Sequence, residues 1–426
     1  MNNDMNIFTQ YESEIRAYCR AAPTVFKSSV NAKLKDENNK EYIDFFAGAG
    51  VLNFGHNNPK MKEAMIEFIQ NDGVGHSLDM FTDVKREFIK SFVETILEPR
   101  GMKYKLQFTG PTGTNAVEAA LKLARKFTKR DDIVAFTKAF HGMTLGALAC
   151  TANEHFRGAA GVSLDNIQRA PFGCETPCIN CHLGCGIEVI GKLRARYEDP
   201  ASGVRPPAAF IVETIQAEGG VRVASKEWLQ ELQKLARDVG ALFIIDDIQA
   251  GCGRTGSYFS FDGFGLDPDI VVLAKGIGGY GTPLAMTLNK PEIDRVWSPG
   301  EHTGTFRGQG LSFVAGKVGL EYFKDDALNK EVAQKGSMIK EFLEKLRDDR
   351  SSMQVRGRGM MVALDVGEGA LSKEIAKECF ENGLLIGVCS GKGEVLKFIP
   401  PLTIEEDTLQ KGLDIFANVF KKVVGS

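Results

Sequence analysis

The sequence predicts an α/β protein whose large domain is built on a mostly parallel, doubly wound sheet. Short apolar runs of strand length alternate with helical segments between residues 100 and 280, which is typical of parallel sheets covered by helices on both faces. Polar residues directly follow at least four of these runs, and open α/β sheets bind ligands at the carboxyl ends of their strands. The N- and C-terminal segments are expected to form a smaller α/β domain together.

The composition indicates a globular protein and disfavours several partner classes. We expect residues 60–310 to form the large domain, and residues 1–59 and 311–426 to form the small one. The net charge of −3 gives no reason to expect nucleic-acid binding. No run of 18 apolar residues predicts a membrane span, and the polar N-terminus does not resemble a signal peptide. The nine cysteines are therefore expected to stay reduced in a cytoplasm.

The first hundred residues predict a hairpin and helices around a stretch of small residues. The expected elements are a short helix or arm, a hairpin and two helices, over Glu12–Cys19, Lys33–Phe46, Pro59–Gln70 and Asp83–Leu97. Small residues around Ala49 would let the backbone approach a ligand closely.

A glycine-containing turn predicts a phosphate site. The expected strand Lys105–Thr109 leads through this turn into the helix Ala116–Phe127. Free backbone N–H groups and the positive end of the helix dipole attract phosphate at such a helix start. Gly113 and Thr114 would make the contacts. The alternative is an ordinary tight loop.

The next strands bring further candidates to the same edge of the sheet. After the strand Asp132–Phe136 come Phe140 and His141, and an aromatic ring there can stack on a flat ligand or can simply belong to the core. The strand Ala208–Val212 precedes Glu218. A helix over Trp228–Val239 follows.

An acid and a lysine follow the two central strands. The runs Ala241–Ile245 and Ile270–Ala274 end at Asp246 and Lys275. A buried lysine has a lowered pKa and can form a Schiff base, and pyridoxal phosphate needs such a lysine together with a carboxylate that keeps its ring nitrogen protonated. The alternative is a helix-capping aspartate beside an exposed lysine.

The remainder of the chain alternates helices and strands, as expected for a small α/β domain. The expected elements lie at Leu311–Lys324, Asn329–Arg347, Val355–Asp365, Lys373–Glu381, Leu384–Val388, Val395–Ile399 and Leu409–Val423.

Taken in order, these motifs resemble the class III pyridoxal-phosphate aminotransferases of fold type I. The resemblance covers about Tyr42 to Leu402, and its most specific part runs from Asp246 through Gly256 to Pro268–Ile270 and Ala274–Gly276. It implies an enzyme that binds pyridoxal phosphate, an amino donor and a 2-oxo acid acceptor, and that forms a homodimer with shared active sites. Asp247 departs from the glutamate that is more frequent in the family.

The resemblance also implies a role for each candidate residue. Lys275 would carry the Schiff base and move the proton, and Asp246 would pair with the ring nitrogen. The implied cofactor contacts are Gly113, Thr114, Phe140, His141, Asp246, Gln249 and Lys275, with Thr305 reaching the phosphate of the neighbouring subunit. The implied substrate contacts are Ala49, Met143, Glu218 and Lys397.

Two departures concern how carboxylates are held. Met143 stands where many members have an arginine for the donor's distal carboxylate, and Lys397 replaces a late arginine that binds the α-carboxylate of glutamate. Lysine offers a point charge rather than a bidentate fork. The pair resembles the diaminobutyrate–2-oxoglutarate branch linked to ectoine formation. Another donor (lysine, taurine, 4-aminobutyrate, a β-amino acid or a diamine) stays open, as does a racemase or mutase on the same scaffold.

A cysteine-rich segment fits that branch less well. Cys174, Cys178, Cys181 and Cys185 have the C-x3-C-x2-C-x3-C spacing of a zinc or iron–sulfur ligand set. We expect no metal, and interpret the segment as a reduced loop near the entrance of the site. A non-catalytic binding protein is the last alternative, and the retained Asp246 and Lys275 disfavour it.

Overall fold

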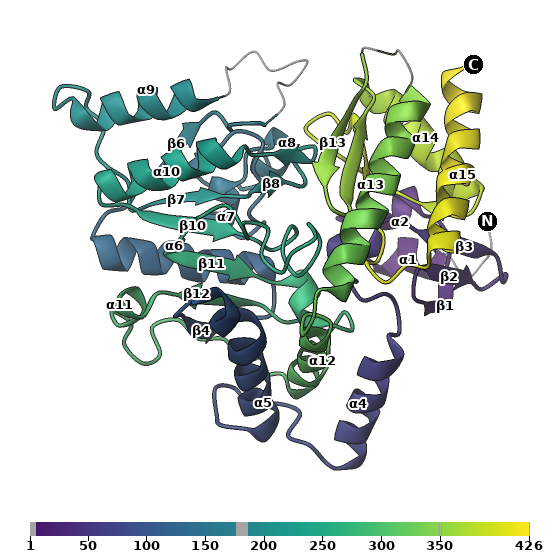
Figure 1. Cartoon of the computed structure of the whole chain (residues 1–426), viewed down its shortest axis with the longest axis horizontal. Coiled ribbons are helices and arrows are strands. Elements are labelled where there is room, and N and C mark those ends of the chain that lie inside the picture. Colours follow the sequence, from purple (N-terminus) through teal and green to yellow (C-terminus); the bar gives the residue numbers. More distant parts are fainter. Residues whose placement is uncertain (1–5, 176–185, 348–349, 351, 426) are drawn as a thin grey trace.

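The computed structural model describes residues 6–175, 186–347, 350 and 352–425. Figure 1 shows a large sheet with its helices on the left, and smaller sheets built from both ends of the chain on the right. Among the described residues, no helix is long and apolar enough to cross a membrane.

The largest sheet has seven strands in the order β4-β12-β11-β10-β7-β5-β6. The strands are β4 Lys105–Phe108, β5 Ile133–Phe136, β6 Ile167–Ala170, β7 Ala209–Val212, β10 Leu242–Asp246, β11 Ile270–Leu273 and β12 Met286–Asn289. β12 is antiparallel to both of its neighbours, whereas β11, β10, β7, β5 and β6 pair in parallel. The predicted mostly parallel sheet is confirmed.

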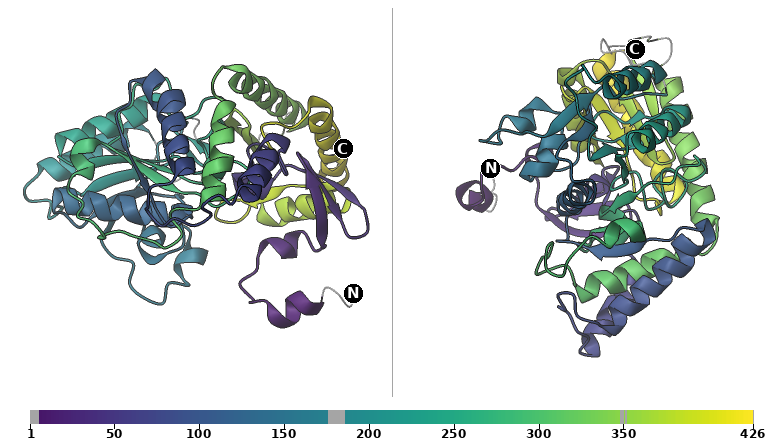
Figure 2. Two further views of the ribbon diagram at one scale, coloured as in Figure 1. Left: turned by 90° about the horizontal axis from the view of Figure 1, so that it is seen from below. Right: turned by 90° about the vertical axis from the view of Figure 1, so that its left-hand side faces the viewer.

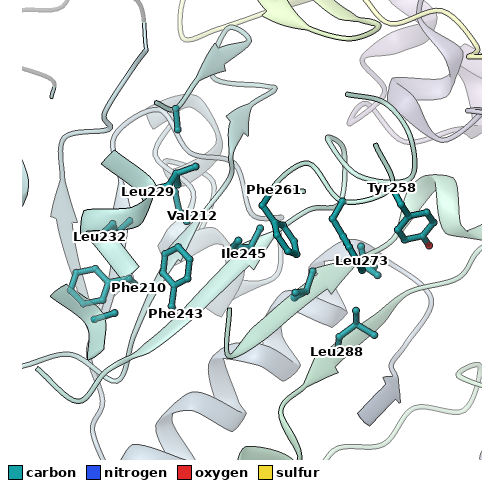
Figure 3. Packing of buried hydrophobic residues seen from close by; sticks show 14 of the residues in the cluster. Phe210, Val212, Leu229, Leu232, Phe243, Ile245, Tyr258, Phe261, Leu273 and Leu288 are labelled. Carbon is teal, nitrogen blue, oxygen red and sulfur yellow. The ribbon is translucent and has the colours of Figure 1, made fainter. Parts of the chain in front are cut away.

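Helices cover both faces of this sheet. Successive residues of a strand point to opposite faces, so neighbouring residues of one strand pack into different cores. Phe243 and Ile245 of β10 pack in one core with helix α10 (Lys226–Asp238) and helix α9 (Ile187–Glu198) (Figure 3). Leu242 and Ile244 belong to the core on the other face, with helix α6 (Gly113–Thr128). This two-sided burial explains the continuous apolar runs in the sequence.

Among the residues that the structure describes, three smaller sheets complete the β-structure. One has the order β1-β2-β3-β15, another β13-β14-β17-β16, and β8 pairs with β9. Their strands are β1 Phe26–Val30, β2 Lys33–Asp36, β3 Glu41–Asp44, β15 Leu384–Leu385, β13 Gln354–Arg358, β14 Met361–Asp365, β17 Val395–Phe398, β16 Gly387–Cys389, β8 Ile215–Gln216 and β9 Arg222–Val223. The predicted hairpin at Lys33–Phe46 is confirmed as β2 and β3.

The two ends of the chain are joined through Phe45. Its N–H donates to the carbonyl oxygen of Leu385 at 2.8 Å, and its carbonyl oxygen accepts from the N–H of Ile399 at 2.9 Å. Strand β3 also pairs in parallel with β15. The two ends share one hydrophobic core, as expected for a small domain built from both ends. The domain boundaries near residues 59 and 310 stay a prediction.

A buried arginine ties this part of the molecule to the loop after β10. Arg254 is 0% exposed and donates through Nη2 to Asn53 Oδ1 at 2.6 Å. Its Nη1 donates to the carbonyl oxygens of Met360, at 3.2 Å, and Pro400. Burial lowers the pKa of Arg254 to about 9, although Asp44 acts in the opposite direction. One side chain therefore connects three separate segments.

The remaining helices complete the fold. The first two, near the N-terminus, lie on an arm that projects from the rest of the molecule (Figure 2). The remaining helices are α1 Asn6–Tyr11, α2 Tyr18–Ala21, α3 Ala47–Gly50, α4 Pro59–Gln70, α5 Asp83–Phe92, α7 Leu145–Cys150, α8 Glu154–Arg157, α11 Pro291–Asp294, α12 Gly310–Glu321, α13 Ala327–Arg347, α14 Gly369–Glu381 and α15 Glu406–Val424.

The secondary structure differs from expectation at a few places. The segment Glu12–Cys19, expected as a short helix or arm, is an arm that leads from α1 into the start of α2, and Ser13 Oγ accepts a local bond from the N–H of Ile15 that competes with helical bonding. Within the expected helix Asp83–Leu97, the α-helical part ends at Phe92, and Val93–Leu97 form a π-helical turn. Strands β6 and β12 were not predicted from the sequence.

Candidate active site

Acidic side chains and a lysine meet at one edge of the large sheet. Asp246 ends β10, Lys275 follows β11 and Glu213 follows β7, and these three strands are parallel. Together with the start of α6 they surround a cavity of about 420 Å³. The predicted residues that line it are Gly113, Thr114, Phe140, His141, Met143, Glu218, Asp246, Gln249 and Lys275.

Lys275 is held in a strained and buried position. Its backbone φ is +52°, in the left-handed region that residues other than glycine seldom adopt. Its Nζ donates to the carbonyl oxygen of Ala49 at 2.9 Å, and Ala49 has a left-handed φ of +58°. Burial lowers the pKa of Lys275 to about 8, although Glu218 raises it. The lowered pKa increases the unprotonated, nucleophilic fraction of the amine near neutral pH to roughly a tenth.

Asp246 is oriented by a buried histidine. Its Oδ2 lies 2.7 Å from Nδ1 of His141, and its Oδ1 accepts from the N–H of Ile248 at 3.2 Å. The His141 ring is fully buried, and its Nε2 has no hydrogen-bond partner among the described residues. The N–H of His141 donates to Thr151 Oγ1 at 3.0 Å, which fixes the loop after β5. The carboxylate is thus rigidly placed in the cavity wall.

The start of α6 has the features of an anion site. Thr112, the residue before the helix, makes no side-chain capping bond, and its carbonyl oxygen accepts from the N–H groups of Asn115 and Ala116, so the N–H groups of Gly113 and Thr114 stay available at the cavity. A Cβ added to Gly113 would lie 2.9 Å from Cδ1 of Ile248, which leaves no room for a side chain. Thr114 Oγ1 lies 2.7 Å from Thr144 Oγ1.

Lys397, Glu218 and Gln249 form one network at the cavity. Lys397 Nζ lies 2.5 Å from Glu218 Oε1 and 3.1 Å from Gln249 Oε1. Gln249 Nε2 donates to Glu218 Oε1 at 3.2 Å and to the carbonyl oxygen of Ala49 at 3.0 Å. Burial would raise the pKa of Glu218, but Lys397 and Lys275 outweigh it and lower that pKa to about 2. Lys397 is therefore committed to a buried ion pair.

Two predicted features lie apart from the cavity or outside the described residues. Ala49, Lys397 and Thr305 are not among the described residues that line it, although Ala49 contacts Lys275 and Lys397 contacts Glu218, which do. Cys178, Cys181 and Cys185 lie outside the described residues, so the predicted absence of a metal at the cysteine cluster stays a prediction. Cys174 is described. It is half-buried, and its backbone pairs with that of Ala224 in an isolated antiparallel β-bridge. The described residues contain no group of three potential metal ligands.

Sequence reasoning missed two residues at the site. Glu213 accepts from the N–H groups of Phe140, at 3.0 Å, and Ala217, at 3.3 Å, and burial and then Asp246 raise its pKa. Its place directly after β7 was the available signal. Tyr18 belongs to the projecting arm and is 70% exposed, and partial burial and then Glu218 raise its pKa. No local pattern in the sequence connects Tyr18 to residues 200 positions away.

Asp247, the departure from the family, lies in a buried hydrogen-bond chain. Its Oδ2 accepts from the N–H of Ser260 at 3.0 Å, and its Oδ1 bonds to the Ser260 hydroxyl. That hydroxyl lies 2.5 Å from Thr214 Oγ1. Burial raises the pKa of Asp247 to about 7, although the bonds to Ser260 lower it.

The raised pKa of Asp247 predicts a pH-dependent stability. Between the ordinary value of 3.8 and about 7, the folded state keeps a proton that the unfolded state has lost, so the free energy of unfolding falls as pH rises. The fall attributable to this group is on the order of 4 kcal/mol, at roughly 1.36 kcal/mol per pH unit. Asp247→Asn preserves the bonding pattern and should remove this component. Urea unfolding of both proteins from pH 4.5 to 7.5 measures it, and equal slopes would contradict the prediction.

The chain matches the family described as Aminotransferase class-III over residues 17–420. The chain is a class III aminotransferase. This confirms the resemblance inferred from the motifs. Similar proteins include the diaminobutyrate–2-oxoglutarate transaminases of Wolinella succinogenes and Halalkalibacterium halodurans, which are 49% and 47% identical. Each alignment covers 99% of this chain and 97% of the relative.

Solved structures agree on the fold of this class III aminotransferase. A Bacillus anthracis aminotransferase superposes with a TM-score of 0.85 at 22% identity, covering 99% of this chain and 100% of that one. The ornithine aminotransferase from Toxoplasma gondii gives 0.83 at 24% identity, covering 99% and 95%. The predicted fold type is therefore confirmed.

Class III aminotransferases depend on pyridoxal phosphate, and the cavity of this aminotransferase fits that group. The uncapped start of α6, closely packed at Gly113, suits a phosphate. A buried carboxylate at Asp246 suits a protonated ring nitrogen, and the buried Lys275 amine suits an aldehyde. These donors come from three strand ends that share one edge of the sheet.

The lowered pKa of Lys275 predicts how cofactor uptake depends on pH. The rate at which the apoenzyme takes up pyridoxal phosphate should rise with pH with a midpoint near pH 8, because only the free amine is nucleophilic. In Glu218→Gln the midpoint should move to lower pH, since Glu218 raises the pKa of Lys275. Stopped-flow absorbance from pH 6 to 9.5 measures both, and a midpoint that stays or rises in the variant would refute this.

Proposed function

We propose that this aminotransferase moves an amino group between glutamate and aspartate 4-semialdehyde, giving L-2,4-diaminobutyrate and 2-oxoglutarate. The observation that carries the proposal is the 49% identity over 422 residues with a diaminobutyrate–2-oxoglutarate transaminase. The apolar Met143 in the cavity wall and the cation Lys397 are in keeping with it. A place in ectoine formation and a cytoplasmic location remain predictions.

The cavity residues divide the chemistry among themselves. Pyridoxal phosphate, when bound, supplies a ring that accepts electrons from the substrate carbon. Lys275 would bind its aldehyde and then move a proton at that carbon, and Asp246, oriented by His141, would keep the ring nitrogen protonated. Gly113 and Thr114 would hold the phosphate, and Phe140 would stack on the ring. Gln249 would donate near the phenolic oxygen.

The Glu218–Lys397 pair supports the use of two different substrates in one cavity. While the pair is closed, Lys397 is neutralised and offers no charge to a substrate that presents a terminal amine. Glutamate brings a carboxylate that can take the place of Glu218 beside Lys397. Ala49 anchors both Lys275 and Gln249 through its carbonyl oxygen and so keeps this network next to the reacting amine.

An exposed apolar surface supports the proposal of a homodimer with shared sites. Val74, Met80, Phe81 and Phe306 are 51%, 58%, 101% and 61% exposed. They lie on two segments held together by the bond of His76 Nε2 to the Thr305 carbonyl oxygen at 2.9 Å. We propose that this surface meets a second copy and carries Thr305 to the partner's phosphate site. Light scattering should give twice the mass of one chain, and a monomer would overturn the proposal.

The first half-reaction tests the substrate. Purified enzyme with bound pyridoxal phosphate is mixed with L-2,4-diaminobutyrate, 4-aminobutyrate, lysine or taurine, and the visible absorbance is followed. Fast conversion with diaminobutyrate, reversed by 2-oxoglutarate, supports the proposal. Conversion with a different amine alone would show that the enzyme is an aminotransferase with another substrate. Turnover that needs no 2-oxo acid would instead indicate a racemase or mutase.

A further inference from the structure

A second cavity of about 340 Å³ adjoins the active-site cavity. Phe140 and Glu218 line both of them. Phe140 thus stands between the two spaces, and its ring meets that of Phe156 edge-on at 5.6 Å within the second one. Phe140 and Glu218 therefore form a wall that is common to the two cavities.

The wall of the second cavity is fixed by close backbone contacts. A Cβ on Gly219 would lie 2.4 Å from the carbonyl oxygen of Lys138, and Lys138 has a left-handed φ of +67°. The N–H of Ser390 donates to the carbonyl oxygen of Glu218 at 2.9 Å. Loops after β5, β8 and β16 therefore converge here in one arrangement.

The two cavities differ in the charges that they offer. Lys275 is the only lysine or arginine among the described residues that line the active-site cavity, and Lys397 beside it is paired with Glu218. A substrate carboxylate thus has no free cation there while the pair is closed. The second cavity is lined by Lys138 and Lys392, and by the acid Glu154 together with Glu218. It offers both signs of charge at one place.

We propose that the second cavity binds the α-amino-acid end of the amino donor, with Lys138 and Lys392 facing its carboxylate and Glu154 its ammonium group. The inference rests on the proposed function, because diaminobutyrate reacts through its terminal amine and carries a zwitterion at its other end. An ionised group that leaves water needs a charged partner. The site thereby selects donors that present a zwitterion beyond Phe140.

Truncated substrates separate the two charges. 4-Aminobutyrate is diaminobutyrate without the α-ammonium group, and 1,3-diaminopropane is diaminobutyrate without the carboxylate. In Lys138→Met/Lys392→Met, the half-saturation concentration should rise about 10-fold or more for diaminobutyrate and 4-aminobutyrate, and stay unchanged for 1,3-diaminopropane. In Glu154→Gln it should rise for diaminobutyrate and 1,3-diaminopropane, and stay unchanged for 4-aminobutyrate. An amine that is not converted is measured as an inhibitor.

Controls keep the outcomes distinct. Lys129→Met removes another exposed lysine with a left-handed φ, of +59°, at the far end of α6, and should change nothing. The glutamate half-reaction should be unaffected in every variant, and an unchanged rate also shows that the variant is correctly folded. If the double variant fails to fold, Lys392→Met alone replaces it, because Lys392 is exposed. If the wild type does not use diaminobutyrate, both proposals fail. If it does and the variants show no substrate-dependent pattern, the second-cavity proposal alone is overturned.

Discussion

Replacing Lys275 with alanine is expected to lower turnover of diaminobutyrate with 2-oxoglutarate by at least about 10⁴-fold, the upper range for loss of a positioned acid–base group. The variant loses both the buried nucleophile and the group that moves the proton. Steady-state turnover and the visible absorbance with added pyridoxal phosphate measure the two losses. Added methylamine should restore part of the turnover, because the space left by the side chain opens into the cavity.

Two further variants show whether the amine itself is responsible. Lys275→Arg keeps a positive charge but not a titratable amine, and should be as inactive as the alanine variant. Lys290→Ala removes a lysine that pairs with Asp267 and Asp269 just after β12, and should leave turnover unchanged. Turnover within tenfold of the wild type in Lys275→Ala would sink the proposed mechanism.

Arg254→Met is expected to lower the free energy of unfolding by on the order of 3 kcal/mol. The change leaves Asn53 Oδ1 and the carbonyl oxygens of Met360 and Pro400 without their buried donor. Hydrogen bonds from a charged donor contribute about 1.5–3 kcal/mol each, and relief from burying the charge offsets part of the loss. Urea unfolding measures the difference.

The matched control is Arg130→Met. Arg130 also donates to three carbonyl oxygens, those of Pro207, Val239 and Gly240, at 2.9–3.1 Å. It is partly exposed, so water can replace it and the loss should be well below that of Arg254→Met. Equal losses for the two variants would contradict the importance given to the burial of Arg254.

Strand positions and the two central reactive residues were predictable because their signals are local. An apolar run that ends in Asp246, and another that ends in Lys275, can be read without knowing any distant contact. The sheet then brings both to one edge, as parallel pairing requires. The antiparallel strand β12 gave no comparable signal, because its four residues include Thr287 and Asn289, which are buried and polar.

The contacts that complete the site were not predictable in the same way. Glu218 raises the pKa of Tyr18, and the carbonyl oxygen of Ala49 accepts from Lys275, across separations of some 200 residues. Lys275 and Ala49 also have a left-handed backbone, which the sequence does not indicate, because lysine and alanine ordinarily favour other conformations. Such features depend on the packing of the whole chain.

The bonds of Phe45 to Leu385 and Ile399 have a consequence for biosynthesis. A nascent chain emerges from the ribosome with its N-terminus first, so β1–β3 leave the exit tunnel long before β15 and β17 are translated. One edge of strand β3 must wait unpaired until β15 has been made. A chain that stops before residue 397 contains Lys275 but has no ion-pair partner for Glu218. The ion pair at the cavity therefore forms only after Lys397 has been translated.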